Sequence, residues 1–260
     1  MKWSRVAVLS LALASSVQAG VPLNAQNAYI AGQFVNAAAL AESDGSAEAL
    51  AFAARARISD AIMRDGVYCA PCLTVAEAIA QNAIDRDPSY AEGYIQLAVA
   101  MGFRGRLLDA MQAQSERLPE KGRAAIDKAL ELDPLNPWAK AALGAWNLEI
   151  VNRAGPVLAD VTYGARKSDG LKAFREALAS DPGNLLMRYH FALTLLALDV
   201  DEFRIEAQTA LQDGIKDPRA DALTQFTRKR AQELEALLKS GKPEEIETLV
   251  RRFQGYPPKS

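Results

Sequence analysis

One pattern occurs three times in this chain and constrains its fold more than any other feature. Each copy is an Ala-containing apolar segment, then Asp-Pro, then a second apolar segment: QNAIDRDPSYAEGYIQLA, DKALELDPLNPWAKAALG and REALASDPGNLLMRYHFA. Because the residue before a proline is driven out of the helical region, Asp87, Asp133 and Asp181 each predict the end of a helix. The chain is therefore expected to consist of helices that end and restart at related points.

Small and large apolar residues recur at fixed distances from Pro88, Pro134 and Pro182. Five positions before each proline lies a small residue (Ala83, Ala129, Ala177), and twelve positions before lies another (Ala76, Gly122, Gly170). Eight positions before lies Ala or a larger apolar residue (Ala80, Ile126, Phe174). Nine and ten positions after lies a pair of one large and one small residue (Leu97-Ala98, Leu143-Gly144, Phe191-Ala192). Positions three or four apart share a helix face, and small residues let helices approach closely. This spacing predicts packed helix pairs.

The pattern resembles the tetratricopeptide repeat family, in which small and large residues line the second helix and a proline ends each repeat. The resemblance implies an all-α fold, a TPR-like superhelix of stacked helical hairpins. Repeats are expected around residues 74–103, 118–153 and 168–199, with C-terminal capping helices over 218–253.

The repeats are longer than those of the family, whose period is about 34 residues. The spacing is 46 residues from Pro88 to Pro134 and 48 residues from Pro134 to Pro182. The additional residues fall between paired helices, in 104–119 and 154–167, so we expect unusually long helices or insertions there. Since both occupy the same place in the repeat, they should emerge on the same side of the stack.

Further helices are indicated by capping residues and by hydrophobic patterns. Ser46 is expected to cap one helix, and Thr74 with Glu77 to form a capping box for the next. Residues 185–198 are apolar on nearly every side, which predicts a buried helix at the centre of the stack. Residues 218–239 have charged side chains opposite an apolar stripe, which is typical of the terminal cap of a repeat stack.

The first 19 residues have the pattern of a secretory signal. Lys2 and Arg5 precede an apolar run of about 12 residues and a small-residue cleavage site that ends at Ala19. A membrane span needs roughly 20 apolar residues. We therefore expect cleavage after Ala19, a single mature domain over 20–260, a periplasmic or secreted location, and no stable membrane insertion of the mature chain.

Charge and composition argue against several classes of partner and chemistry. Without Lys2 and Arg5, 28 basic side chains stand against 32 acidic ones, so no basic excess favours nucleic acid. His190 is the only histidine and falls within the predicted buried helix, so neither a zinc site nor a histidine-dependent catalytic set is expected. We predict no metal, no cofactor and no enzymatic activity.

Cys69 and Cys72 form the one reactive-looking motif, CAPC. In an oxidising compartment, two cysteines at this spacing close a small disulfide, which is the interpretation we favour over two free thiols. A redox or ligand function is the third possibility, because a thiolate is favoured near a helix N-terminus. Redox proteins with such a motif need a strand–helix–strand setting, which this sequence does not predict.

The insertions contain the candidate binding residues. Their basic and aromatic side chains are suited to hold an acidic peptide or a small anion through charge-assisted hydrogen bonds: Arg104, Arg106, Arg153, Tyr163 and Arg166. The alternative for each is a solvated surface charge balanced by nearby acids.

A repeat stack offers a long concave groove, so its shape is suited to binding. The sequence therefore predicts an exported TPR-like scaffold for a protein or peptide partner. One alternative is a periplasmic small-molecule carrier, with a pocket formed by the long insertions. Another is a thiol-dependent enzyme that uses Cys69 and Cys72.

Overall fold

A computed structural model of the chain describes residues 20–64 and 66–257. Over these residues the chain forms helices and no strands, which confirms the predicted all-α fold class. The predicted signal segment, residues 1–19 with its cut after Ala19, lies outside the described residues. In the described part, no helix is both long enough and apolar enough to cross a membrane.

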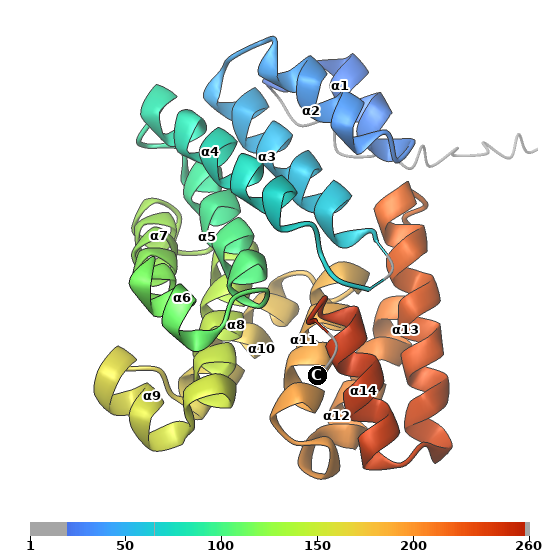
Figure 1. The fold of residues 1–260 in the computed structure, drawn as a ribbon. Coiled ribbons are helices and arrows are strands. Elements are labelled where there is room, and N and C mark those ends of the chain that lie inside the picture. The colour runs from blue at the N-terminus through green and yellow to red at the C-terminus, as the bar shows by residue number, and fades with distance from the viewer. Residues whose placement is uncertain (1–19, 65, 258–260) are drawn as a thin grey trace, which may run out of the picture.

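The helices follow one another with short connections (Figure 1). Their bounds are α1 (Leu23–Ile30), α2 (Phe34–Glu42), α3 (Ala47–Ile62), α4 (Ala70–Arg86), α5 (Ala91–Gly105), α6 (Ala110–Ser115), α7 (Leu118–Leu132), α8 (Pro137–Ala154), α9 (Pro156–Tyr163), α10 (Lys167–Ser180), α11 (Leu185–Leu198), α12 (Val200–Ile215), α13 (Ala222–Ser240) and α14 (Pro243–Phe253).

The three Asp-Pro sites form the same turn. Helices α4, α7 and α10 each end one residue before the aspartate, as predicted. The backbone N–H groups of Tyr90, Asn136 and Asn184 donate to the carbonyl oxygens of Asp87, Asp133 and Asp181 at 3.1, 3.2 and 3.2 Å. The proline lies at the second position of each turn, where its fixed φ is favourable. These turns connect α4 to α5, α7 to α8 and α10 to α11.

Small residues lie where the helices cross, as the repeat pattern predicted. Ala83, Ala129 and Ala177 are all completely buried. Helices α8 and α10 approach closely, since a Cβ atom added to Gly144 would lie 2.9 Å from the carbonyl oxygen of Gly170. The absence of side chains at these two positions lets the two helices pack against each other.

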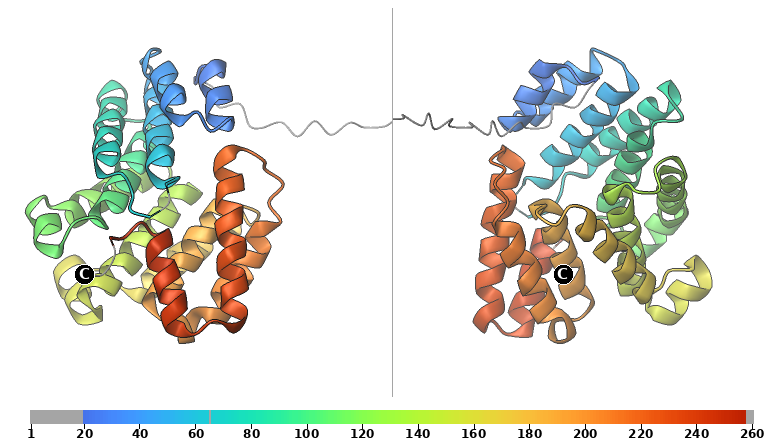
Figure 2. Two further views of the ribbon diagram at one scale, coloured as in Figure 1. Left: turned by 45° about the vertical axis from the view of Figure 1, so that its right-hand side comes forward. Right: turned by 180° about the vertical axis from the view of Figure 1, so that it is seen from behind.

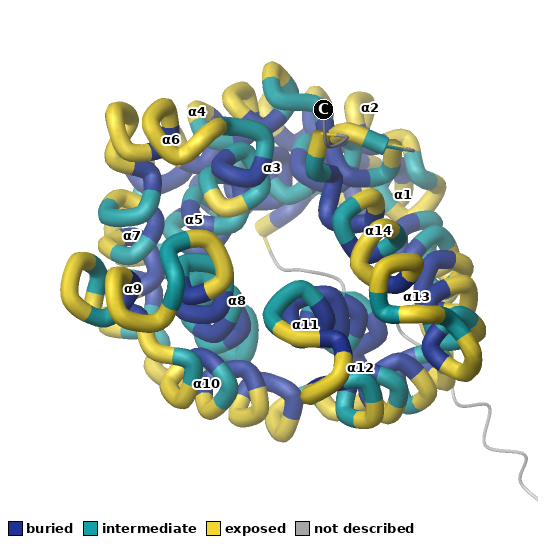
Figure 3. Tube along the Cα trace, turned by 60° about the horizontal axis from the view of Figure 1, so that its bottom comes forward, coloured by how far each residue is buried: buried dark blue, intermediate teal, exposed yellow. Residues whose placement is uncertain are grey.

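The helices are arranged in a ring (Figure 3). Helices α3, α5, α8 and α11 pack successively along its inner side, and each also packs against a helix of the outer side, α4, α7, α10 or α12. Most of α11 is buried, as predicted from its uniformly apolar sequence. Figure 2 shows α13 and α14 as neighbours at one side of the ring, beside α12.

The C-terminal helices return to the N-terminal half of the chain. The Tyr68 hydroxyl, before α4, donates to the carbonyl oxygen of Phe253 at 2.6 Å. The Tyr68 backbone N–H donates to the carbonyl oxygen of Gly255 at 3.4 Å. The Arg230 guanidinium, on α13, donates to the carbonyl oxygen of Arg64 at 2.8 Å. The apolar stripe of α13 is covered by this closure and by α12 and α14.

One predicted helix cap is confirmed, and another differs from the structure. Ser46 caps α3 as expected, accepting the Ala49 N–H at 3.3 Å. Thr74 does not cap α4: it lies inside the helix, and the Cys69 sulfur is the cap instead. Asp199 caps α12 by accepting from the Glu202 N–H at 2.8 Å.

We predict that Ala129→Leu lowers the free energy of unfolding by about 1–3 kcal/mol, because α7 leaves no space for added volume at this buried contact. Ala124→Leu, at an exposed position of the same helix, should be nearly neutral. Urea unfolding followed by circular dichroism measures both. Equal stabilities would show that Ala129 does not lie at a tight helix contact.

Candidate functional site

The two insertions lie together on the outside of the ring. They form the short helices α6 and α9 (Figure 1). The Tyr163 hydroxyl at the end of α9 hydrogen-bonds to Oε1 of Gln114 on α6 at 2.6 Å. The expectation that both insertions emerge on the same side is therefore confirmed. Gly155, with a positive φ of 79°, separates α8 from α9.

Arg104 connects the first insertion to the body of the protein. Its Nε atom donates to Glu77 Oε1 on α4 at 2.6 Å, and its Nη1 atom donates to Glu116 Oε2 just after α6 at 2.6 Å. The hydrogen bond to Glu77 raises the pKa of the guanidinium, so the arginine stays charged. Its donors are directed at these two carboxylates, which hold α4, α5 and the insertion together.

Arg153 and Arg166 also have partners within the protein. Arg153 donates to the carbonyl oxygens of Gly105 at 2.6 Å and Leu108 at 3.0 Å, which lie at the end of α5 and just beyond it. A cation is favourable there, because the last carbonyls of a helix carry partial negative charge. Arg166 pairs with Asp160 of α9 at 2.8 Å. Both arginines hold insertion segments in place.

Arg106 lies apart from the other predicted binding residues, in the interior of the ring. Its side chain is only 8% exposed. Its Nε and Nη2 atoms donate to Glu149 Oε2 at 3.3 and 3.2 Å, and the Tyr256 hydroxyl hydrogen-bonds to the other oxygen of Glu149. The Nη1 atom of Arg106 has no hydrogen-bond partner among the described residues.

A row of aromatic rings continues from this ion pair across the closure of the ring. Successive ring centroids lie 5.6 Å apart for Tyr68 and Phe103, 5.5 Å for Phe103 and His190, 5.5 Å for His190 and Tyr189, and 6.3 Å for Tyr189 and Phe253. We refer to these residues and their charged neighbours as the closure cluster: Tyr68, Phe103, Arg106, Glu149, Tyr189, His190, Arg230, Phe253 and Tyr256. It joins segments from both halves of the chain.

The guanidinium groups of Arg106 and Arg230 lie over rings of this cluster. The Arg106 Cζ atom is 5.3 Å from the Phe103 ring centroid, and that of Arg230 is 5.0 Å from the Phe253 centroid. Burial, helped by these two positive charges, lowers the pKa of His190 to about 3. Burial raises the pKa of Tyr68 and of Tyr256. At neutral pH the histidine is therefore uncharged.

The insertions expose several large apolar side chains, which the sequence analysis did not predict. Met111 of α6 is 82% exposed, and Val157, Leu158 and Val161 of α9 are 78%, 54% and 82% exposed. Ala159, on the opposite side of α9, is completely buried. Helix α9 therefore packs through a small residue and turns its larger apolar side chains outward. The signal in the sequence was the segment PVLADVTY, whose apolar residues exceed what one buried face requires.

Cys69 and Cys72 are joined by a disulfide, as predicted. Of the surface hollows in the described part, one lies between α13 and α14 and another beside the start of α2; neither is lined by an insertion residue. Residues 20–64 and 66–257 contain no group of three His, Cys, Asp or Glu side chains placed to hold a metal ion.

Glu149→Ala should lower the free energy of unfolding by about 3–5 kcal/mol, because it leaves the Arg106 charge buried without its carboxylate. The double variant Arg106→Met/Glu149→Leu removes both charges and should recover most of that loss. Denaturant unfolding of both variants measures the difference. A double variant as unstable as the single one would mean that packing, and not charge, sets the cost.

Stability should fall as the pH decreases from about 6.5, the ordinary pKa of histidine, towards about 3, the pKa of His190 in the folded protein. In this window the unfolded chain binds a proton at His190 and the folded protein does not, so unfolding is favoured by up to about 1.4 kcal/mol per pH unit. His190→Gln should remove this contribution. The stability difference between the two proteins, measured by urea unfolding from pH 4 to 7, should then depend on pH; a constant difference would contradict the prediction.

No model of a known protein family matches this chain, and no curated protein matches it.

Proposed function

We propose that this protein is an exported scaffold of the tetratricopeptide type that binds another protein through the outer surface of α6 and α9. The observation that supports this most directly is the group of exposed apolar side chains on the two insertion helices. We call this group the insertion face: Met111, Val157, Leu158 and Val161.

Exposed apolar side chains occur singly on most proteins, but concentrated ones mark interaction surfaces. The insertion face places four of them on two short helices that are held together by the Tyr163–Gln114 hydrogen bond. Arg104 and Arg153 fix the surrounding segments to the body of the protein. A surface held in place in this way loses little conformational freedom on binding, which favours affinity.

The chemistry of the insertion face favours a protein partner with apolar side chains of its own. Its members are uncharged, and the exposed Arg166–Asp160 ion pair on its border is internally balanced. Nucleic acid would need a row of unpaired cations, and a small anion would need donors that are directed outward. The predicted arginines are instead directed at acids and carbonyls of the protein itself.

The tetratricopeptide interpretation is supported by the three identical Asp-Pro turns and the three completely buried alanines. In an open stack of this type, the concave inner side would be available to a peptide. Here the closure cluster occupies the inner side, with Tyr256 hydrogen-bonded to Glu149. This shifts the proposed binding surface from the groove to the outside of the ring. The carrier alternative receives no comparable support, because the hollows described above lie away from the insertions.

The double variant Val157→Glu/Val161→Glu should weaken partner binding on the order of tenfold or more, since it places charges in the apolar contact. A photo-crosslinker placed at Leu158, which belongs to the same face, identifies the partner in cells, and titration with that purified partner measures the affinity. Thermal stability should not change, because both substituted side chains are exposed.

The matched control is Leu135→Glu, which charges an apolar side chain that is 77% exposed in the turn between α7 and α8. It should leave the affinity for the crosslinked partner unchanged. Equal binding by the insertion-face variant and by the unmodified protein would refute the proposal. An equal loss in both variants would show that the interaction does not depend on the insertion face.

A further inference from the structure

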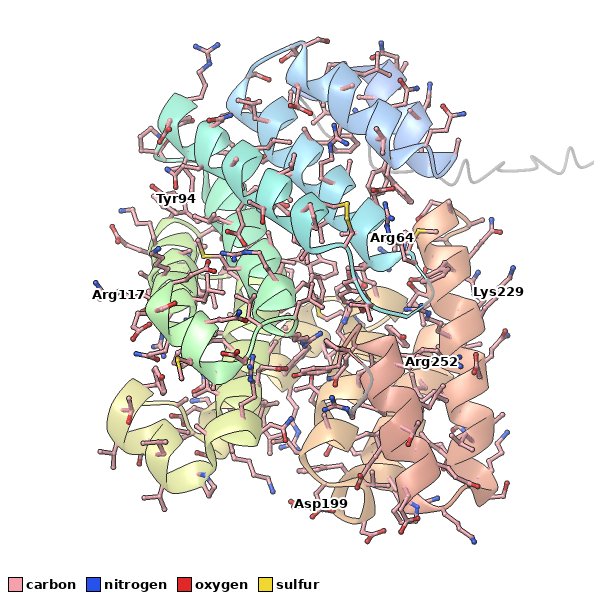
Figure 4. The ribbon with its side chains drawn as sticks, viewed as in Figure 1. Arg64, Tyr94, Arg117, Asp199, Lys229 and Arg252 are labelled. Carbon is pink, nitrogen blue, oxygen red and sulfur yellow. A yellow bond between two sulfur atoms is a disulfide. The ribbon has the colours of Figure 1, made fainter. Side chains whose placement is uncertain are left out.

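Both sulfur atoms of the Cys69–Cys72 disulfide are contacted by hydrogen-bond donors. Cys69 is the N-cap of α4, and its Sγ atom accepts from the backbone N–H of Cys72 at 3.3 Å. Arg64, in the connection between α3 and α4, donates from Nη2 to the Cys72 Sγ atom at 3.8 Å (Figure 4). The same Nη2 atom donates to Asp60 Oδ2 at 3.1 Å.

These donors favour the sulfur atoms most when they are negatively charged, which requires that the disulfide be open. A thiolate at Cys69 would accept a hydrogen bond at the positive end of the α4 dipole. A thiolate at Cys72 would lie beside the Arg64 guanidinium. The surroundings therefore stabilise the product of reduction more than the neutral disulfide, and a stabilised leaving thiolate also departs faster.

The disulfide is accessible from outside. Cys69 and Cys72 are both partly exposed, and Pro71 between them is exposed. Two apolar side chains flank the pair: Val67 is 44% exposed and Val75 is 46% exposed. A partly exposed disulfide bordered by apolar side chains offers a surface on which an extended peptide that contains cysteine can lie.

A purely structural role explains this disulfide poorly. The bond joins residues three apart, and so short a loop restricts the unfolded chain less than a long one. The closure of the ring beside it depends on other contacts, such as the Tyr68 hydroxyl on Phe253.

We propose that the Cys69–Cys72 disulfide is a thiol–disulfide exchange site for dithiols, in particular for cysteine pairs of other proteins. One thiolate of the dithiol attacks Cys72 Sγ, where Arg64 attracts the negative charge. The Cys69–Cys72 bond breaks, and Cys69 leaves as a thiolate that takes the bonding electrons. The second thiolate of the dithiol then attacks the first sulfur of the same dithiol, which is bonded to Cys72 in the mixed disulfide. Cys72 leaves as a thiolate. Two electrons and two protons pass to this protein, and the dithiol becomes a disulfide.

The test uses the purified oxidised protein in dithiothreitol buffers of varied ratio of reduced to oxidised reagent. Alkylation and mass spectrometry count the thiols, while circular dichroism follows the fold. We expect reduction of the folded protein. Arg64→Ala should lower both the equilibrium constant and the rate of reduction on the order of threefold, as expected for a partly exposed charge. Asp60→Asn should raise both, because it releases Arg64 and removes a repelling charge.

Arg57→Ala is the matched control, since Arg57 lies on α3 like Asp60 but pairs with Glu42 at 3.8 Å. This substitution should leave the equilibrium constant and the rate of reduction unchanged. In a second assay, the oxidised protein should convert a peptide with two reduced cysteines to its disulfide, and Cys69→Ser should abolish this while keeping a hydroxyl at the N-cap. Three outcomes would each overturn the proposal. The first is that the disulfide is reduced no faster than the protein unfolds globally, the second is that the Arg64→Ala variant is reduced like the unmodified protein, and the third is that the oxidised protein fails to oxidise the peptide. None of these variants touches the insertion face, so this proposal and the proposed partner binding fail independently.

Discussion

The close crossing of α8 and α10 is the contact on which the arrangement of the other helices depends. Gly144 and Gly170 lie so close that neither helix could carry a side chain at that point without moving. The completely buried Ala129 and Ala177 of α7 and α10 have a related role in their own helices. Because neighbouring helices meet through small residues, the angle between them is set by backbone contact, which is less adaptable than contact between flexible side chains.

Closure of the ring changes what the inner side of the molecule can do. The segment after α14 is bound to the inner helices: Tyr256 hydrogen-bonds to Glu149 on α8, and Gln254 donates to the Leu193 carbonyl oxygen on α11. Gly255 permits this path, since it has a positive φ of 75° and any side chain there would overlap the Tyr68 ring. The inner side is therefore filled by contacts within the protein itself.

The features predicted correctly from the sequence are those that local sterics determine. An aspartate before proline cannot continue a helix, so the three turns could be placed before their partners were known. The start of α4 was missed because cysteine is not among the usual capping residues, while Thr74 and Glu77 have the spacing of a capping box inside the helix.

The candidate site was harder to predict, because burial of a charged residue depends on distant partners. The sequence around Arg106 does not differ clearly from that around Arg104 or Arg153. Yet Arg106 is the one enclosed by Glu149 and Tyr256, and Tyr256 lies 107 positions after Glu149 in the chain. No local pattern distinguishes them. The disulfide, by contrast, could be predicted from the spacing of its two cysteines together with the oxidising compartment that the sequence led us to expect.

The contact between Tyr68 and Phe253 joins residues that are 185 positions apart, and that between Arg64 and Arg230 spans 166 positions. In an open repeat array each unit touches only its neighbours, so folding can begin anywhere and the ends fray first. These two contacts between distant segments raise the contact order of the protein. The chain must close a very long loop before they form, and this slows folding. Once formed, the closure gives the terminal helices partners on both sides, and the ring should unfold as one cooperative unit instead of one hairpin at a time.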